Sequence, residues 1–195
     1  MSRWQPLWLL VSFGLAVAVN HLMRPRVTYE LSPGERTMTT GALHVDDWGG
    51  AQDLRLATIH LVTGQVRRPF AEPFVVQELW MRSPEQEGQG GPDFELFVDY
   101  GAPGAEPRGP GDIVGRDLPV LPAAAGGNAR SRIRFVGAEK ALEVTQGHVR
   151  LREALPTETA SIFRVDGELD LVLPSDNGQR NVHGHFNARL VWDQR

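Results

Sequence analysis

An uncharged apolar stretch near the N-terminus constrains this chain more than any other feature of the sequence. Residues 4–23 contain no Asp, Glu, Lys or Arg. At about 1.5 Å per residue they form a helix of about 30 Å, the thickness of a bilayer's hydrocarbon core. Trp4 and Trp8 lie near its start, where indole rings favour the headgroup layer, and Arg24 and Arg26 follow its end. The stretch therefore predicts one transmembrane helix, with the lipid bilayer as its partner.

A cleavable signal peptide is the competing interpretation of the same stretch. It would combine the apolar run 7–17 with the small residues Ala16 and Ala18, and cleavage would fall before Val19. We favour a retained signal-anchor, so that residues 1–26 form the membrane anchor of a single-pass protein in a bacterial-type inner membrane. Basic residues slightly favour a cytoplasmic domain, but a short N-terminus usually sends the following chain outward, so we expect a periplasmic domain.

The remaining residues, 27–195, have the length of one domain. The whole chain has a net charge of −4, which argues against a nucleic-acid partner because phosphate backbones select basic surfaces. It has no cysteine, so disulfides and thiol chemistry are excluded. It has 21 glycines and 14 prolines, a composition typical of many turns and few long helices.

Short runs of alternating or fully apolar residues, separated by turn residues, predict a mainly β domain. The sequence predicts strands at residues 27–31, 54–62, 74–81, 94–100, 132–136, 148–152, 162–173 and 182–192, with turns at 32–35 and 63–65 and either a strand or a helical turn at 138–144. In residues 94–100, Glu95 and Asp99 are expected to face outward. This pattern favours an antiparallel β-sandwich or a partly closed barrel.

The last two strands predict a hairpin whose register follows from its turn. Asn177-Gly178 is the strongest two-residue hairpin signal, because both positions tolerate positive φ. That turn would pair Leu169 with Phe186, and Asp170 with His185. Phe163, Phe186 and Trp192 would then lie in the core, and His183 and His185 would face outward.

A proline- and glycine-rich loop is predicted at residues 101–127. Proline removes backbone donors, so the loop is not expected in the middle of a sheet. The simpler interpretation is a mobile surface insertion. The alternative is an extended segment that contacts a partner through Pro103, Pro107 and Pro110.

His183 and His185 are the weak candidates for chemistry. Spaced by two residues on a strand, they project from one face, and Asp170 would complete a set of transition-metal ligands or orient a general base. Solvated surface histidines are the commoner explanation. The same holds for the lone His60 and His148, and for the pair Asp46-Asp47, which suggests at most weak Ca²⁺ binding. No catalytic motif is present, so no enzyme activity, cofactor or metal is expected.

Two functions from different classes fit the sequence. The first is a non-catalytic accessory subunit of a larger membrane protein complex, in which a single anchor tethers a β-domain that contacts other subunits. The host would be a bioenergetic, secretion or envelope assembly. The second is an anchored or secreted domain that binds a ligand or a glycan. An enzyme ranks third.

Overall fold

The computed structural model describes residues 32–46, 50–67, 73–85, 92–103, 106, 108–120, 131–135, 138–176 and 178–195. The predicted anchor, with Trp4, Trp8, Arg24 and Arg26, and the predicted strand 27–31 lie outside these residues. Within the described ranges, no helix is long and apolar enough to cross a membrane.

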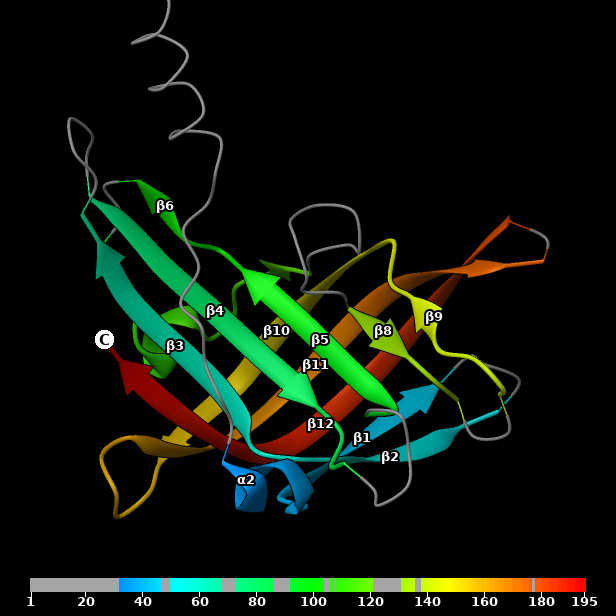
Figure 1. The fold of residues 1–195 in the computed structure, drawn as a ribbon, viewed down its shortest axis with the longest axis horizontal. Coiled ribbons are helices and arrows are strands. Elements are labelled where there is room, and N and C mark those ends of the chain that lie inside the picture. Colours follow the sequence, from blue (N-terminus) through cyan, green and yellow to red (C-terminus); the bar gives the residue numbers. More distant parts are fainter. Residues whose placement is uncertain are drawn as a thin grey trace, which may run out of the picture.

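The described part of the chain is mainly β, as predicted, and its twelve strands form one sheet that curls into a half-barrel (Figure 1). In chain order the elements are α2 (Pro33–Thr37), β1 (Gly41–Asp46), β2 (Gln52–Leu56), β3 (Ile59–Val66), β4 (Phe74–Arg82), β5 (Phe94–Asp99), β6 (Ala102–Pro103), the 3-10 helix η1 (Pro110–Ile113), β7 (Leu118–Pro119), β8 (Arg132–Ile133), β9 (Leu142–Glu143), β10 (Gln146–Pro156), β11 (Ile162–Ser175) and β12 (Gly178–Gln194).

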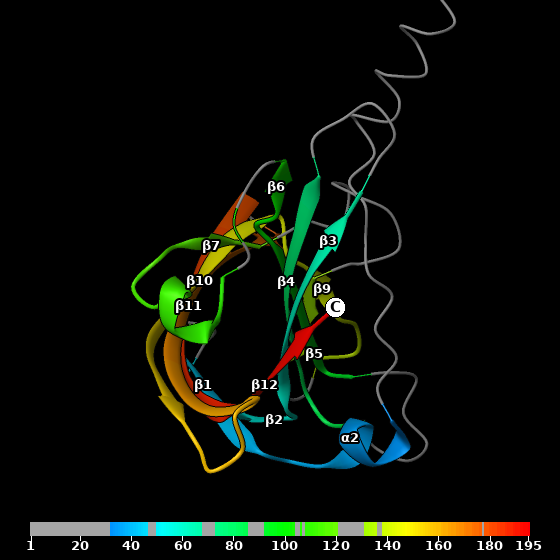
Figure 2. The same ribbon diagram turned by 90° about the vertical axis from the view of Figure 1, so that its left-hand side faces the viewer.

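The long strand β12 is the branch point of the sheet. Along one edge it pairs with β11, and along the other it pairs first with β1 and then with β3. The β12–β3 pair is parallel, so the sheet is mixed and the prediction of a purely antiparallel sheet is wrong at this pair. Figure 2 shows the result: β10, β11 and β12 curve along one side, and β3, β4 and β5 lie along the other. The apolar faces of both sides meet in one core.

The alternation of β11 and β12 places their inward residues in that core, as predicted. Phe186 is buried, and Phe163 and Trp192 pack against the cluster from its margin, with ring centroids 6.4 Å apart. Residues 148–152 follow the predicted faces too, with Val149 and Leu151 buried.

The predicted register of the hairpin is wrong by two residues. Ser175 pairs with Gly178, which has a φ of 120°, so Gly178 belongs to the strand and not to the predicted Asn177-Gly178 turn. Phe186 therefore lies opposite Gly167, and Asp170 lies opposite His183. A shift of two residues preserves the alternation of faces, which is why the predicted core residues are nonetheless buried.

Four local predictions also need correction. Residues 54–62 are not one strand, because β2 ends at Leu56 and β3 begins at Ile59, and the predicted turn 63–65 lies inside β3. The predicted turn 32–35 opens α2, whose capping box joins Ser32 and Glu35. Asp99, predicted to face outward, is buried.

His60 is buried in β3, with only 2 % of its surface exposed. Burial lowers its pKa to about 4, against the opposing charges of Glu35 and Asp193. The imidazole is therefore neutral at pH 7 and lies in the packed interior.

The described part of the proline-rich segment 101–127 is packed, contrary to the prediction of a mobile insertion. Ile113, Leu118 and Val120 belong to the core cluster. The amide of Gly115 donates to Leu151 O at 2.8 Å, the amide of Val120 donates to Gly147 O at 2.9 Å, and Val120 also bridges to Val98 of β5. Residues 108–120 therefore span from β10 to β5 across the open side of the curled sheet.

Candidate functional site

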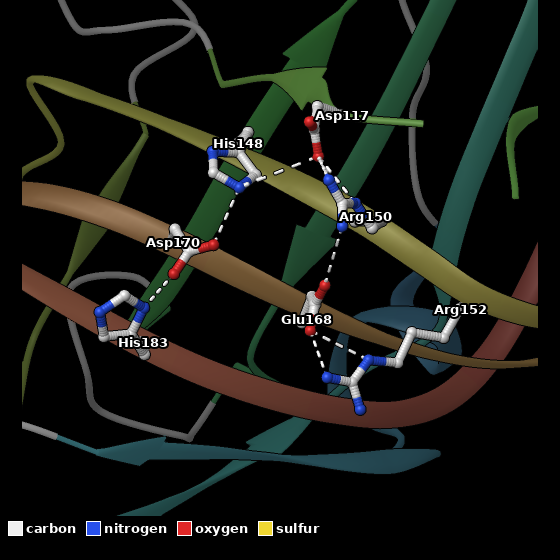
Figure 3. Close-up of polar contacts among 7 residues, drawn as sticks. All are labelled: Asp117, His148, Arg150, Arg152, Glu168, Asp170 and His183. Carbon is white, nitrogen blue, oxygen red and sulfur yellow. Dashed lines mark hydrogen bonds and ion pairs between the residues drawn. The ribbon is translucent and has the colours of Figure 1, made fainter. Parts of the chain in front are cut away.

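The outer face of β10, β11 and β12 carries rows of charged and polar side chains that run across the strands. Antiparallel pairing places His148, Asp170 and His183 in one row, and Arg150, Glu168 and His185 in the next. The outer-face network is defined by the members that contact one another (Figure 3): Asp117, His148, Arg150, Arg152, Glu168, Asp170 and His183.

Asp170 links two imidazoles in the first row. Its Oδ2 lies 2.8 Å from Nε2 of His148, and its Oδ1 pairs with Nδ1 of His183. His148 Nε2 also lies 3.9 Å from Oδ1 of Asp117, which is contributed by the segment before β7. Asp170 therefore uses both of its oxygens to hold two histidines from neighbouring strands in fixed positions (Figure 3).

Arginines connect the second row to the first. Arg150 Nε donates to Asp117 Oδ1 at 2.8 Å, and its terminal nitrogen lies 3.6 Å from Glu168 Oε1. Arg152 Nε donates to Glu168 Oε2 at 3.0 Å. Arg152 follows Arg150 by two residues, so the alternation of β10 places both on the outer face, and the register of β10 and β11 shifts at Arg152, between Leu151 and Glu153.

A second histidine cluster continues the same face onto β1 and β2. His44 Nδ1 lies 2.7 Å from Asp53 Oδ1, and its Nε2 lies 3.2 Å from Asp46 Oδ1. The hydrogen bond with Asp53 raises the pKa of His44, and Asp46 adds to this effect while desolvation opposes it. The ring of His44 stacks on His185, with centroids 5.8 Å apart. Every outward histidine described on these strands thus contacts a carboxylate or another imidazole.

The structure brings together two of the three predicted site residues. Asp170 and His183 are paired, but His185 contacts His44 instead. Within the described ranges, no group of three or more His, Cys, Asp or Glu side chains has the arrangement needed to hold a metal ion. His148 and His183 are engaged by carboxylates, and the described contacts of their imidazoles include no hydroxyl that a general base would activate.

Sequence reasoning missed His44, His148, Asp117 and the arginines as neighbours of these residues. The alternation of His148, Arg150 and Arg152 was a usable signal for an outward polar row. His44 gave no comparable signal, because its contact with His185 depends on the pairing of β1 with β12, far apart in sequence.

The predicted partner-contact prolines are dispersed. Pro110 opens η1 and is buried, so its ring is not accessible to a partner in this structure. Pro103 lies in β6, which pairs with β4. Pro107 lies outside the described residues. Of the aspartate pair, Asp46 contacts His44, and Asp47 is not among the described residues.

No protein-family model, curated protein or solved structure matches this chain. Its function therefore has to be argued from the geometry of its own side chains.

Removing the two predicted metal-ligand histidines tests the site directly. We expect His183→Ala combined with His185→Ala to change the free energy of unfolding by less than about 1 kcal/mol, because exposed ion pairs contribute little. The zinc content of the purified protein, measured by mass spectrometry, should not change. Asn181→Ala, at another outward position of β12, is the matched control. Loss of one zinc per chain in the double variant alone would establish the metal site instead.

Proposed function

We propose that this protein is a single-pass, membrane-anchored accessory subunit of a larger membrane protein complex. Its β-domain, in the periplasm, would bind another subunit through the outer-face network without catalysing a reaction. The observation that carries the proposal is a solvent-facing sheet surface on which charges of both signs are held in ordered rows by contacts between strands.

The regular arrangement of these charged rows is better suited to docking a partner than to stabilising the fold. Exposed ion pairs stabilise a fold by only about 0.2–1 kcal/mol each. Held in place by neighbours on rigid strands, the same charges present a fixed electrostatic pattern, which gives a protein interface its specificity and association rate. Asp170 and Glu168 each receive contacts from more than one strand or side chain, so their positions are set before any partner arrives.

The uncharged stretch 4–23 supplies the membrane part of the proposal. A domain tethered by one helix stays close to the bilayer, where its partner subunits would be found. Pro103 and Pro107 remain candidate secondary contacts for such a partner.

We also propose that the curled sheet is a partly closed barrel rather than a sandwich. Residues 108–120 support this, because Val120 bonds to Gly147 of β10 and bridges to Val98 of β5. Those two strands lie on opposite sides of the curl, so the segment closes part of the gap between them.

Native electrophoresis of the tagged chain from its own membranes, extracted in a mild detergent, tests the docking proposal. The wild-type chain should migrate in a complex of fixed composition. Arg152→Glu should reduce the complexed fraction about tenfold, since opposed like charges at an interface cost more than 1 kcal/mol. Lys140→Glu, an exposed substitution between β8 and β9, is the control and should have no effect.

A wild-type chain that migrates alone would contradict the accessory-subunit proposal. It would favour the second candidate, an anchored or secreted domain that binds a small ligand or a glycan. That candidate has its own support in an open hollow of about 660 Å³ beside the start of β11 and residues 187–189 of β12.

A further inference from the structure

One cross-strand row on the outer face breaks the charge pattern of its neighbours. Arg164 of β11 lies directly opposite Arg189 of β12, whereas Asp170 lies opposite His183 and Glu168 opposite His185. Like charges in directly opposed positions destabilise a sheet. Among the described residues, neither guanidinium forms an ion pair with a carboxylate. A local violation of this kind is expected where a site is maintained for binding.

The two arginines line the open hollow of about 660 Å³. Its other walls are formed by the residue immediately before β1, by the loop between β10 and β11, and by the start of β11. The residues that matter for recognition are Thr40, Glu158, Ile162, Phe163, Arg164 and Arg189. The volume lies in the range of sites for small organic molecules.

Two buried polar atoms at the hollow lack a hydrogen-bond partner. They are Nε of Arg189 and Oγ1 of Thr40. A buried donor without a partner costs about 1–3 kcal/mol, more when it is charged, so such groups are normally satisfied. The side chains of Arg189 and Thr40 are therefore not fully satisfied by contacts within the protein.

The charge balance favours an anion. Glu158 is the one carboxylate among the residues that line the hollow, against two guanidinium groups. Glu35 lies within electrostatic range of Arg189, but its pKa is lowered mainly by the hydrogen bond from Ser32, and Arg189 contributes only a minor part. The lining of the hollow therefore carries two positive side chains against one negative side chain.

We propose that this hollow binds the phosphate group of a small phosphoester or of a lipid headgroup. Guanidinium groups match phosphate oxygens with paired donors, which makes arginine the preferred residue for this chemistry. Ile162 and Phe163 offer apolar surface to the organic part of the ligand. The inference is independent of the partner docking proposed above, because it uses no member of the outer-face network.

Equilibrium dialysis with radiolabelled inorganic phosphate tests the site on the full chain in an uncharged detergent at constant ionic strength. The wild-type chain should bind one phosphate saturably. Arg164→Gln combined with Arg189→Gln should weaken binding about a hundredfold, about tenfold for each charge-assisted contact. Arg116→Gln, which removes an exposed arginine outside the hollow, should leave the affinity unchanged.

Thermal unfolding without phosphate separates binding from a structural role. The double arginine variant should be as stable as the wild type or more stable, since it removes a like-charge pair. Reconstitution into phosphatidylcholine liposomes with and without phosphatidic acid then shows whether the bound phosphate group belongs to a lipid headgroup or to a free phosphoester. If inorganic phosphate binds more weakly in the liposomes that contain phosphatidic acid, the site binds a lipid headgroup. If it binds equally in both kinds of liposome, the site binds a free phosphoester. Absence of saturable binding, or equal losses in the double variant and Arg116→Gln, would overturn the proposal.

Discussion

Phe186→Ala is expected to lower the free energy of unfolding by about 3–5 kcal/mol, the usual cost of truncating a buried phenylalanine. Phe186 is only 1 % exposed, on the strand that joins the two sides of the curled sheet. Its ring occupies the space above Gly167, where an added Cβ would lie 2.5 Å from Cζ of the phenylalanine. Few neighbours can therefore move in to refill the cavity. Chemical denaturation followed by circular dichroism measures the loss.

Asn187→Ala is the matched control for this variant, because Asn187 is the next residue of β12 and faces outward. It should change the free energy of unfolding by about 0.5 kcal/mol or less. Similar losses in both variants would show that the faces of β12 are assigned incorrectly.

Coupling between Gly167 and Phe186 tests the register of the hairpin. Gly167→Ala alone should destabilise the protein, since the new methyl group would meet the ring and also lie 2.6 Å from Arg150 O. In the Phe186→Ala background the same change should cost less, because the contact with the ring is gone. The register predicted from Asn177-Gly178 would place Gly167 opposite Ala188 and gives no reason for this coupling. Additive losses would therefore contradict the observed pairing.

The alternation of side chains predicted which residues of the hairpin are buried, but it could not fix their partners. A register shift of two residues moves every pair without turning any side chain to the other face. Turn chemistry was the only local signal for the register, and the Asn-Gly pair pointed to a register that differs from the observed pairing of Ser175 with Gly178. The outward position of His183 and its neighbourhood with Asp170 could thus be anticipated, but their direct pairing could not.

Contacts between distant strands account for most of what the sequence did not predict. The stacking of His44 on His185 and the parallel pairing of β3 with β12 both depend on how β12 divides its edge between two strands. No local periodicity encodes such a division. The Arg164–Arg189 row has a different origin, since it follows from the register of the hairpin, which the turn signal misassigned.

The segment around η1 was misjudged for a different reason. Its prolines and glycines indicated an unpacked loop, and its contribution to the sheet is indeed small, since its strands β6 and β7 are each two residues long. Its few apolar residues nevertheless enter the core. The composition correctly predicted that this segment forms little regular strand, but it could not show that the side chains of Ile113, Leu118 and Val120 are buried.

Ile113→Ala should lower the free energy of unfolding by about 2–5 kcal/mol, which is large for a residue in a proline-rich segment. Ile113 is 0 % exposed and belongs to the core, and the chain around it is bonded to β10 through Gly115 and Leu151. Removing its side chain would leave a cavity on the side of the sheet that this segment spans. Urea denaturation measures the loss, and limited proteolysis should show faster cleavage within residues 108–120 in the variant.

Val114→Ala provides the control for the segment, because Val114 is the neighbouring residue and is 36 % exposed. Its loss should stay within about 1 kcal/mol, and its cleavage pattern should match that of the wild type. If Ile113→Ala is no more harmful than Val114→Ala, the segment does not contribute to the core, and the proposed partly closed barrel loses its main support. If both variants are strongly destabilised, the side chain of Val114 also packs against the protein, contrary to its exposure in this structure.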